Sequence, residues 1–292
     1  MKKHRTWLFA PGNHPRTMEK AMETKADVVI YDLEDAVPLE EKEQARNMAT
    51  QHLQKKHIDK APYKLLRVNE STSPFFSEDV KAGVRNGAHG LVLPKAENPD
   101  HIKEMDEWIS TLEEENGLPV GHIELLPLLE SALGVHNSYE IARAAPRIER
   151  LSFGAIDYTA DMQTKISGYG EELLYAQSQL VNSSYAAGIE GPIDTVYPDF
   201  HNEEGLVEET ERGIRLGFKG KMIIHPKQIE PVNHAYTPSE QEVQEALEIV
   251  DAYERAKERG DGAIQLKGKM IDVPVVKGAQ RTLDMMEVLK EE

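Results

Sequence analysis

Residues 28–35 read Val-Val-Ile-Tyr-Asp-Leu-Glu-Asp, an apolar run that passes directly into three acids. A run that is apolar at nearly every position is typical of a strand buried on both faces, as in a parallel sheet. In barrels of parallel strands, functional side chains lie at the carboxyl ends of the strands. The stretch therefore predicts a fold built on buried parallel strands and acidic groups at their ends.

Runs of the same kind recur along the chain and are separated by longer amphipathic stretches. The predicted strands are 6–10, 28–32, 64–68, 90–93, 123–129, 151–154, 193–197 and 221–225. Helical patterns occupy 15–25, 40–56, 99–115, 171–187 and 205–216, and several begin at proline or stop at glycine. This alternation predicts an α/β protein with a (β/α)8 TIM barrel, with an open doubly wound sheet as the alternative.

The C-terminal part of the chain does not continue the alternation. We expect the barrel to span residues 1–237 and a helical and extended C-terminal extension to span 238–292. A long helix over 239–258 would begin at a capping box of Ser239 and Glu242. A hairpin or extended segment within 263–274 and a last helix over 277–290 follow. We expect this extension to cover the barrel mouth or to reach a neighbouring subunit.

The composition excludes several classes of protein. The 292 residues carry a formal net charge of −17, which argues against nucleic acid or an anionic membrane as the main partner. There is no cysteine, so disulfides, thiolate nucleophiles and zinc–sulfur sites are excluded. No apolar run approaches the ~20 residues of a membrane span, and the first one is too short for a signal sequence. We therefore expect a cytoplasmic protein.

Two acids follow neighbouring strands of the predicted barrel. Glu130 comes after the fifth strand and Asp157 after the sixth, so their carboxylates can point at one spot. Such oxygen ligands suit Mg²⁺, with Mn²⁺ as a second possibility, and water or substrate would fill the other positions. The alternative is that both acids cap the helices that follow them. Asp161, four residues further on, is a rival ligand.

Other strand ends supply candidate substrate contacts. Arg67 carries a planar guanidinium suited to a carboxylate, although a salt bridge to the acids of residues 32–35 is an equal alternative. Lys95 could balance the same acids or contact the substrate. Pro11 and Gly12 precede a predicted helix, where a turn can hold an anionic group or serve only as a connection.

Longer stretches of the chain resemble the citrate lyase β-subunit family, within the HpcH/HpaI-type aldolases. They occur in family order at residues 8–21, 26–46, 65–69, 91–97, 124–134, 151–161, 191–199, 217–229, 236–243 and 268–274. The resemblance implies a (β/α)8 barrel assembled as a homotrimer or hexamer, with Mg²⁺ on Glu130 and Asp157. It also implies that Arg67 binds carboxylate or carbonyl oxygens of the substrate. The implied substrates are citramalyl, malyl or citryl thioesters of coenzyme A or an acyl carrier protein.

The resemblance also assigns roles to residues outside the predicted metal pair. Asp272 matches the aspartate of the family's Met-Ile-Asp segment, which in related lyases comes from an adjacent subunit and acts in acid–base chemistry. Glu34 and Asp35 match acids near the metal's waters, and Ala132 is a further candidate substrate contact. These roles imply a Mg²⁺-dependent lyase that breaks, or in reverse forms, a carbon–carbon bond.

Two departures from the family pattern bear on the substrate. Met162-Gln163 replaces a Leu-Gly pair, and Lys267 replaces the aspartate often found before Gly-Lys-Met-Ile-Asp. Two alternatives remain open at this point. One is an aldolase for free 4-hydroxy-2-oxo acids, and the other is a non-catalytic subunit of a citrate lyase complex.

Overall fold

The structure is a computed structural model that describes residues 4–55, 61–258, 260 and 262–290. Contacts divide the chain into two compact units, His4–Asn233 and the chain from His234 onward. The change of unit falls inside helix α10 (Ile229–Tyr236). Among the helices of the described residues, none is both long and apolar enough to cross a membrane.

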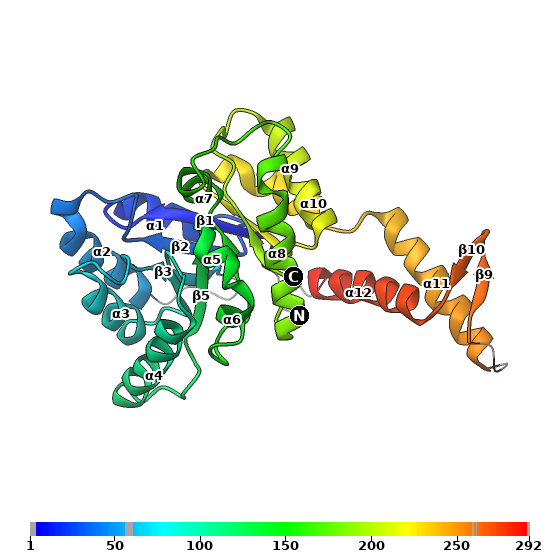
Figure 1. Ribbon diagram of the computed structural model, residues 1–292, viewed down its shortest axis with the longest axis horizontal. Coiled ribbons are helices and arrows are strands. Elements are labelled where there is room, and N and C mark those ends of the chain that lie inside the picture. Colours follow the sequence, from blue (N-terminus) through cyan, green and yellow to red (C-terminus); the bar gives the residue numbers. More distant parts are fainter. Residues whose placement is uncertain (1–3, 56–60, 259, 261, 291–292) are drawn as a thin grey trace. The chain divides into compact units, whose positions relative to one another are not determined.

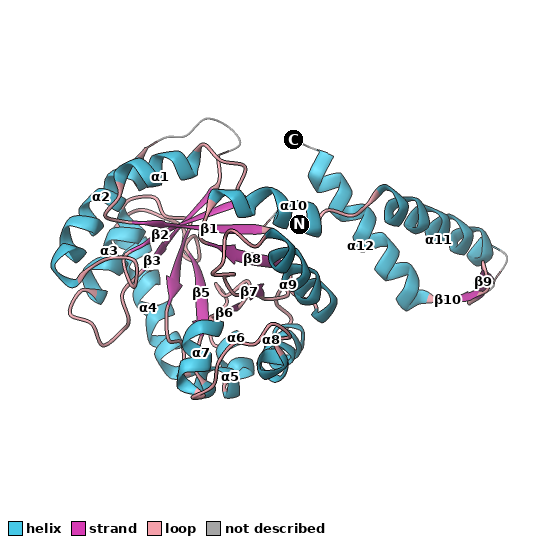
Figure 2. Ribbon diagram, turned by 90° about the horizontal axis from the view of Figure 1, so that it is seen from above, coloured by secondary structure: helices cyan, strands magenta, loops and turns pink. Residues whose placement is uncertain are grey.

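The unit His4–Asn233 is a closed barrel of eight parallel strands (Figure 1). The strands are β1 (Thr6–Pro11), β2 (Val28–Asp32), β3 (Tyr63–Arg67), β4 (Gly90–Leu93), β5 (Glu124–Leu129), β6 (Ser152–Phe153), β7 (Ile193–Asp194) and β8 (Gly220–Ile223). Viewed from above, the strands lie at the centre with helices around them (Figure 2). Because β1 pairs with β8, the (β/α)8 prediction is confirmed and the open sheet is wrong.

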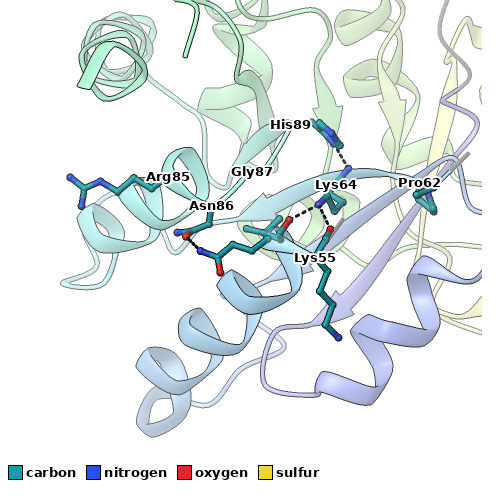
Figure 3. A pocket seen from close by; sticks show the side chains of 10 residues that line it. Lys55, Pro62, Lys64, Arg85, Asn86, Gly87 and His89 are labelled. Carbon is teal, nitrogen blue, oxygen red and sulfur yellow. Dashed lines mark hydrogen bonds between the residues drawn. The ribbon is translucent and has the colours of Figure 1, made fainter. Parts of the chain in front are cut away.

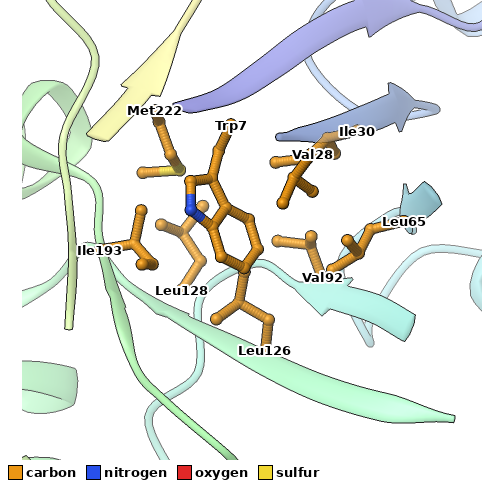
Figure 4. Packing of buried hydrophobic residues seen from close by; sticks show 9 residues of the cluster. All are labelled: Trp7, Val28, Ile30, Leu65, Val92, Leu126, Leu128, Ile193 and Met222. Atoms are coloured by element: carbon orange, nitrogen blue, oxygen red, sulfur yellow. The ribbon is translucent and has the colours of Figure 1, made fainter. Parts of the chain in front are cut away.

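The interior of the barrel is an apolar core around Trp7, which is fully buried (Figure 4). The other members are Val28, Ile30, Leu65, Val92, Leu126, Leu128, Ile193 and Met222. Positions between them, such as Leu8 and Val29, are buried as well. Since successive side chains of a strand point to opposite faces, burial on both faces explains why the strands are apolar throughout.

Helices around the barrel connect successive strands. They are α1 (Pro15–Met22), α2 (Lys42–Gln54), α3 (Phe76–Arg85), α4 (Pro99–Glu115), α5 (Ala132–His136), α6 (Ser138–Ala142), α7 (Ala155–Asp161), α8 (Leu174–Ala187) and α9 (Glu203–Leu216), with 3-10 turns η1 (Leu39–Glu41), η2 (Glu171–Leu173) and η3 (Pro226–Gln228). Asn98 caps α4 by accepting from the Asp100 N–H at 2.9 Å, and Gly217 ends α9 with a φ of 115°. These local signals explain why the ends of these helices were predictable.

Two differences from the sequence prediction have physical reasons. The sequence pattern does not predict α3, because Gly83 interrupts it. A Cβ at Gly83 would lie 2.4 Å from Cδ2 of Leu91, so the glycine lets α3 pack closely on β4. Strands β6 and β7 are shorter than predicted, and the chain after β6 turns at once into α7, which carries Asp157.

The second unit contains α11 (Glu240–Glu258), the hairpin of β9 (Ile264–Leu266) and β10 (Lys269–Ile271), and α12 (Val273–Lys290). Ser239 and Glu242 form the predicted capping box. The Glu242 carboxylate accepts from the Ser239 N–H at 2.8 Å, and Ser239 Oγ accepts from the Glu242 N–H at 3.2 Å. Lys267 and Gly268 both have positive φ, as a two-residue type I′ hairpin turn requires.

Candidate active site at the barrel mouth

Arg67 lies at the carboxyl end of β3, at the mouth of the barrel, beside its register partner Asp32 on β2. Its Nε donates to Asp32 Oδ1 at 2.7 Å and its Nη2 to Oδ2 at 2.6 Å. Burial alone would raise the pKa of Asp32, but the guanidinium and nearby backbone N–H groups outweigh it and lower that pKa. The internal salt bridge that the sequence left open is therefore present, and it is buried.

The loop after β2 brings two more acids to the same guanidinium. Nη1 of Arg67 lies 3.0 Å from Glu34 Oε2 and donates to Asp35 Oδ2 at 3.2 Å. Lys42 holds the loop, because its ammonium donates to the Glu34 carbonyl at 2.7 Å. Burial, together with repulsion from neighbouring acids, raises the pKa of Glu34 to about 8 despite the attraction of Arg67. Glu34 therefore keeps its proton at neutral pH.

Glu130 follows β5 and is 5% exposed. Its Oε1 accepts from the Lys95 N–H at 2.8 Å. Gly154 leaves room for the other oxygen, since a Cβ at that position would lie 2.6 Å from Oε2. Burial raises the pKa of Glu130 to about 7, with repulsion from Asp157 adding to the effect and the Lys95 amide opposing it. A nearby cation would stabilise the ionised form of Glu130 and so lower its pKa.

Asp157 lies in the first turn of α7 and is exposed to solvent. It is close enough to Glu130 to shift the pKa of that residue, so the two predicted metal ligands are neighbours at the mouth. The cap of α5 is Ser131, whose Oγ accepts from the Gly134 N–H at 3.1 Å, and not Glu130. The capping alternative is therefore wrong for Glu130.

The pair supplies only part of a coordination shell. In the part of the chain that the structure describes, no group of three or more His, Asp or Glu side chains is arranged to hold a metal. A cation on Glu130 and Asp157 would therefore take its other ligands from water or a bound acid. Mg²⁺ commonly binds in this way, through one or two carboxylates.

Three of the residues predicted to contact the substrate already form hydrogen bonds within the protein. The Gly12 N–H donates to a carbonyl at the end of β2 at 2.8 Å. The Ala132 N–H donates to Asp161 Oδ2 at 2.7 Å, and the Lys95 ammonium donates to Glu70 Oε2 at 2.6 Å. A bound anion would have to compete with these acceptors. Because Asp161 accepts this hydrogen bond from Ala132, it has a structural role that does not depend on metal binding.

Two further predicted residues lie outside this group of contacts. Pro11 is the last residue of β1 and is half-buried. Asp272 belongs to the second unit, where its Oδ1 accepts from the Val275 N–H at 3.3 Å at the start of α12. Its predicted part in acid–base chemistry stays a prediction.

Sequence reasoning missed Lys42 and Gly154. A lysine at the start of a helix is ordinarily solvated, so nothing in the sequence indicates that Lys42 is buried among carbonyls. A glycine directly after a strand can mark close approach of another group, and this signal could have connected Gly154 with Glu130.

A hollow also lies at the opposite end of the barrel, where β3 and β4 begin (Figure 3). Its lining includes Lys55, Lys64, Arg85 and His89. Lys64 donates to the Leu53 carbonyl near the end of α2 at 2.5 Å. Since the chemistry of such barrels takes place at the carboxyl ends of the strands, the mouth and not this hollow is the candidate active site.

The raised pKa of Glu34 makes the stability of the metal-free protein depend on pH. The folded protein keeps this proton up to a pKa of about 8, whereas the unfolded chain releases it near pH 4.5. The stability contributed by this group is therefore complete below pH 4.5 and is lost as pH rises toward 8. We expect the melting temperature of Glu34→Gln, relative to the parent protein, to be higher at pH 9 than at pH 5 by roughly 8–16 °C.

Thermal denaturation in EDTA at both pH values measures this difference. Glu104→Gln on α4, an exposed position, is the control and should show no such change with pH. If the melting temperature of Glu34→Gln differs from that of the parent protein by the same amount at pH 5 and pH 9, then Glu34 does not hold a proton in the folded protein.

The mouth thus combines an arginine held by three acids with two carboxylates that repel one another. This combination is suited to a divalent cation and a small anionic acid. The fold is that of a (β/α)8 barrel, and its mouth carries a candidate site for such a cation and acid.

Comparisons with known proteins identify the family. The sequence profile of the HpcH/HpaI aldolase/citrate lyase family matches residues 5–226. The citrate lyase subunit beta of Leuconostoc mesenteroides subsp. cremoris is 41% identical over 282 residues, which cover 96% of this chain and 92% of that protein. The L-malyl-CoA/beta-methylmalyl-CoA lyase of Cereibacter sphaeroides is 33% identical over 308 residues, covering 98% and 95%. The chain belongs to the HpcH/HpaI aldolase/citrate lyase family.

A solved structure is also similar over nearly the whole chain. The CitE protein of Mycobacterium tuberculosis, in complex with magnesium, acetoacetate and coenzyme A, matches with a TM-score of 0.80 and 28% sequence identity. The match covers 97% of this chain and 98% of that chain. The resemblance inferred from sequence motifs is confirmed.

Proposed function

We propose that the protein is a Mg²⁺-dependent lyase that breaks a carbon–carbon bond in a β-hydroxyacyl thioester, or forms it in reverse. The relatives named citrate lyase subunit beta and L-malyl-CoA/beta-methylmalyl-CoA lyase support this reaction class. The CitE complex with magnesium, acetoacetate and coenzyme A supports the cofactor and the thioester. In this chain, the proposal rests on the Glu130–Asp157 pair near Arg67.

The residues at the mouth fit a magnesium ion. Glu130 and Asp157 offer oxygen donors only, which Mg²⁺ and Mn²⁺ both accept. The buried Glu130 has a raised pKa of about 7, so a cation would stabilise its ionised form. When bound, the ion would polarise the oxygens of a 2-oxo acid unit and stabilise negative charge that develops there.

The protein's own groups would orient the acid and move protons. Arg67 would bind carboxylate or carbonyl oxygens of the substrate. In cleavage, the substrate hydroxyl gives its proton to a base, and the carbon–carbon electron pair passes to the thioester as an enolate, which then takes a proton at carbon. We assign acceptance of the hydroxyl proton to Asp35, beside the protonated Glu34, and delivery of the proton to carbon to Asp272 of a neighbouring subunit.

Parallel assays distinguish the proposal from its alternatives. Purified protein is given malyl-, citramalyl- and citryl-CoA or free 4-hydroxy-2-oxo acids, with Mg²⁺, with Mn²⁺ or with EDTA. We expect cleavage of at least one thioester with Mg²⁺ and none with EDTA. Cleavage of the free acids alone would favour the aldolase. Mg²⁺ binding without turnover of any compound would favour a non-catalytic subunit.

Asp157 and Asp161 are expected to differ in their effect on metal binding. Asp157→Asn should weaken Mg²⁺ binding at least about tenfold, because it removes a charged ligand. Asp161→Asn is the matched control, since its oxygen already accepts from the Ala132 N–H and asparagine can keep that bond. Isothermal titration without substrate measures both. A larger loss at Asp161 would assign the ligand to that residue instead.

Asp272 is expected to affect turnover and not metal binding. Asp272→Asn should lower kcat about a hundredfold or more, the usual contribution of an acid–base group, and leave the Mg²⁺ dissociation constant unchanged. Asp284→Asn, an exposed position on the same α12 helix, is the control. Steady-state kinetics compare the two, and equal activity of Asp272→Asn and the parent protein would remove Asp272 from the mechanism.

We also propose that the protein is a cytoplasmic homo-oligomer, a trimer or a hexamer. Large apolar side chains are exposed on α7, α8 and the segment between them, among them Ile156, Met162, Tyr169 and Tyr175. Apolar groups exposed on neighbouring segments are typical of an association surface. Light scattering of the purified protein gives its mass and tests the assembly.

A further inference from the structure

Lys95 has a backbone conformation that is unusual for its residue type. Within the described residues, three non-glycine residues have positive φ, and Lys95 is the one at a barrel strand end, with a φ of 49°. Residues with a side chain disfavour this left-handed region, and glycine does not. Strain of this kind is often found next to functional sites.

The left-handed turn aims two successive amides at the same neighbouring segment. The Lys95 N–H donates to Glu130 Oε1 at 2.8 Å, and the Ala96 N–H donates to the Leu128 carbonyl of β5 at 3.1 Å. In an extended chain successive N–H groups point in opposite directions. The φ and ψ angles of Lys95 set the relative direction of these two N–H groups. Its left-handed conformation therefore lets both of them face β5 and Glu130, the residue that follows β5.

The Lys95 side chain is directed elsewhere. Its ammonium donates to Glu70 Oε2 at 2.6 Å, and both side chains are well exposed. Exposed ion pairs contribute little to stability, so this contact does not explain why the strained backbone persists. The hydrogen bond from the Lys95 N–H has a buried acceptor, the Glu130 carboxylate. This bond therefore explains better why the left-handed backbone of Lys95 persists.

We propose that Lys95 is a positioning residue whose left-handed backbone, and not its ammonium group, orients Glu130 for Mg²⁺. The proposal rests on the proposed function, because it assumes that Glu130 is a metal ligand. It is supported by Gly154, where any Cβ would lie 2.6 Å from the second oxygen of Glu130, so the glycine leaves the space that this orientation of the carboxylate needs. One oxygen is held by an amide, and the other lies where only a glycine leaves room.

Substitutions at Lys95 separate the backbone from the side chain. Lys95→Gly removes the ammonium and favours the left-handed conformation, so its Mg²⁺ dissociation constant should stay within about threefold of the parent value. Lys95→Val disfavours that conformation and should raise the dissociation constant about tenfold. Lys95→Gln removes only the charge and should match the parent protein. Isothermal titration of Mg²⁺ without substrate measures all four proteins.

The opposite results would overturn the proposal. If Lys95→Gly and Lys95→Gln bind Mg²⁺ as weakly as Lys95→Val, the ammonium group is responsible. If Lys95→Val binds as tightly as the parent protein, the backbone conformation has no effect. Circular dichroism confirms folding, and Lys95→Thr, which is also β-branched, replaces the valine variant if that variant does not fold.

Crystal structures of the metal-free variants keep this inference separate from the proposed function. Lys95→Gly should retain the contact between the amide of residue 95 and Glu130, and Lys95→Val should lose it. If the parent protein does not bind Mg²⁺, the proposed function fails, but these structures still decide whether the backbone positions Glu130. Retention of the contact in Lys95→Val would refute the positioning role.

Discussion

In the Glu130→Gln variant, kcat/KM for Mg²⁺-dependent cleavage of the thioester is expected to fall by roughly a thousandfold or more. Glutamine has the shape of glutamate and can still accept from the Lys95 N–H, but it lacks the negative charge that holds the ion. The same change removes a buried carboxyl whose pKa is raised by burial and by repulsion from Asp157. The metal-free variant should therefore be at least as stable as the parent protein.

Activity and stability together make this prediction specific. Steady-state kinetics at saturating Mg²⁺ and thermal denaturation in EDTA are measured on the same preparations. Glu104→Gln, an exposed glutamate on α4, is the matched control and should change neither quantity. A Glu130→Gln enzyme with more than about a tenth of the parent activity would exclude Glu130 as an essential ligand.

Arg67→Met is expected to lower both stability and activity. Methionine fills similar space without charge, so Asp32 would stay buried without its bidentate partner, and Glu34 and Asp35 would lose theirs. Breaking a buried ion pair in this way costs roughly 3–5 kcal/mol of unfolding free energy. Turnover should be lost as well, because the substrate loses its guanidinium. Arg67→Lys keeps the positive charge but not the bidentate geometry of the guanidinium. Its stability and activity should therefore lie between those of Arg67→Met and those of the parent protein.

A double variant separates the two roles of Arg67. Asp32→Asn combined with Arg67→Met removes both members of the buried pair and should recover much of the stability. It should not recover turnover, because the positive charge at the mouth is still absent. Chemical denaturation and kinetics give the two readouts. Recovery of turnover in the double variant would show that Arg67 is only structural.

The barrel could be predicted from the sequence because its signals are local and repeated. Apolar runs such as 28–32 are typical of buried strands, and Pro99 and Gly217 mark helix ends by themselves. Helix α3 could not be predicted, because Gly83 weakens the pattern for a reason that only packing against Leu91 reveals.

The candidate site was predictable as a set of residues, but not as a set of contacts. Strand counting placed Glu130 and Asp157 on adjacent strand ends, and the structure makes them neighbours. The sequence could not show that Asp161 accepts from the Ala132 N–H, because that bond joins the end of α7 to the start of α5. Nor could it indicate the left-handed conformation of Lys95, since lysine has no preference for it.

The central claim is that Glu130 and Asp157 hold the catalytic metal, and anomalous diffraction tests it most directly. Crystals soaked with Mn²⁺ and a 2-oxo acid should show one strong anomalous peak in contact with a carboxylate oxygen of each residue. The acid should lie between that peak and Arg67. A peak elsewhere in the protein, or an acid bound at the mouth with no metal beside Glu130, would contradict the account.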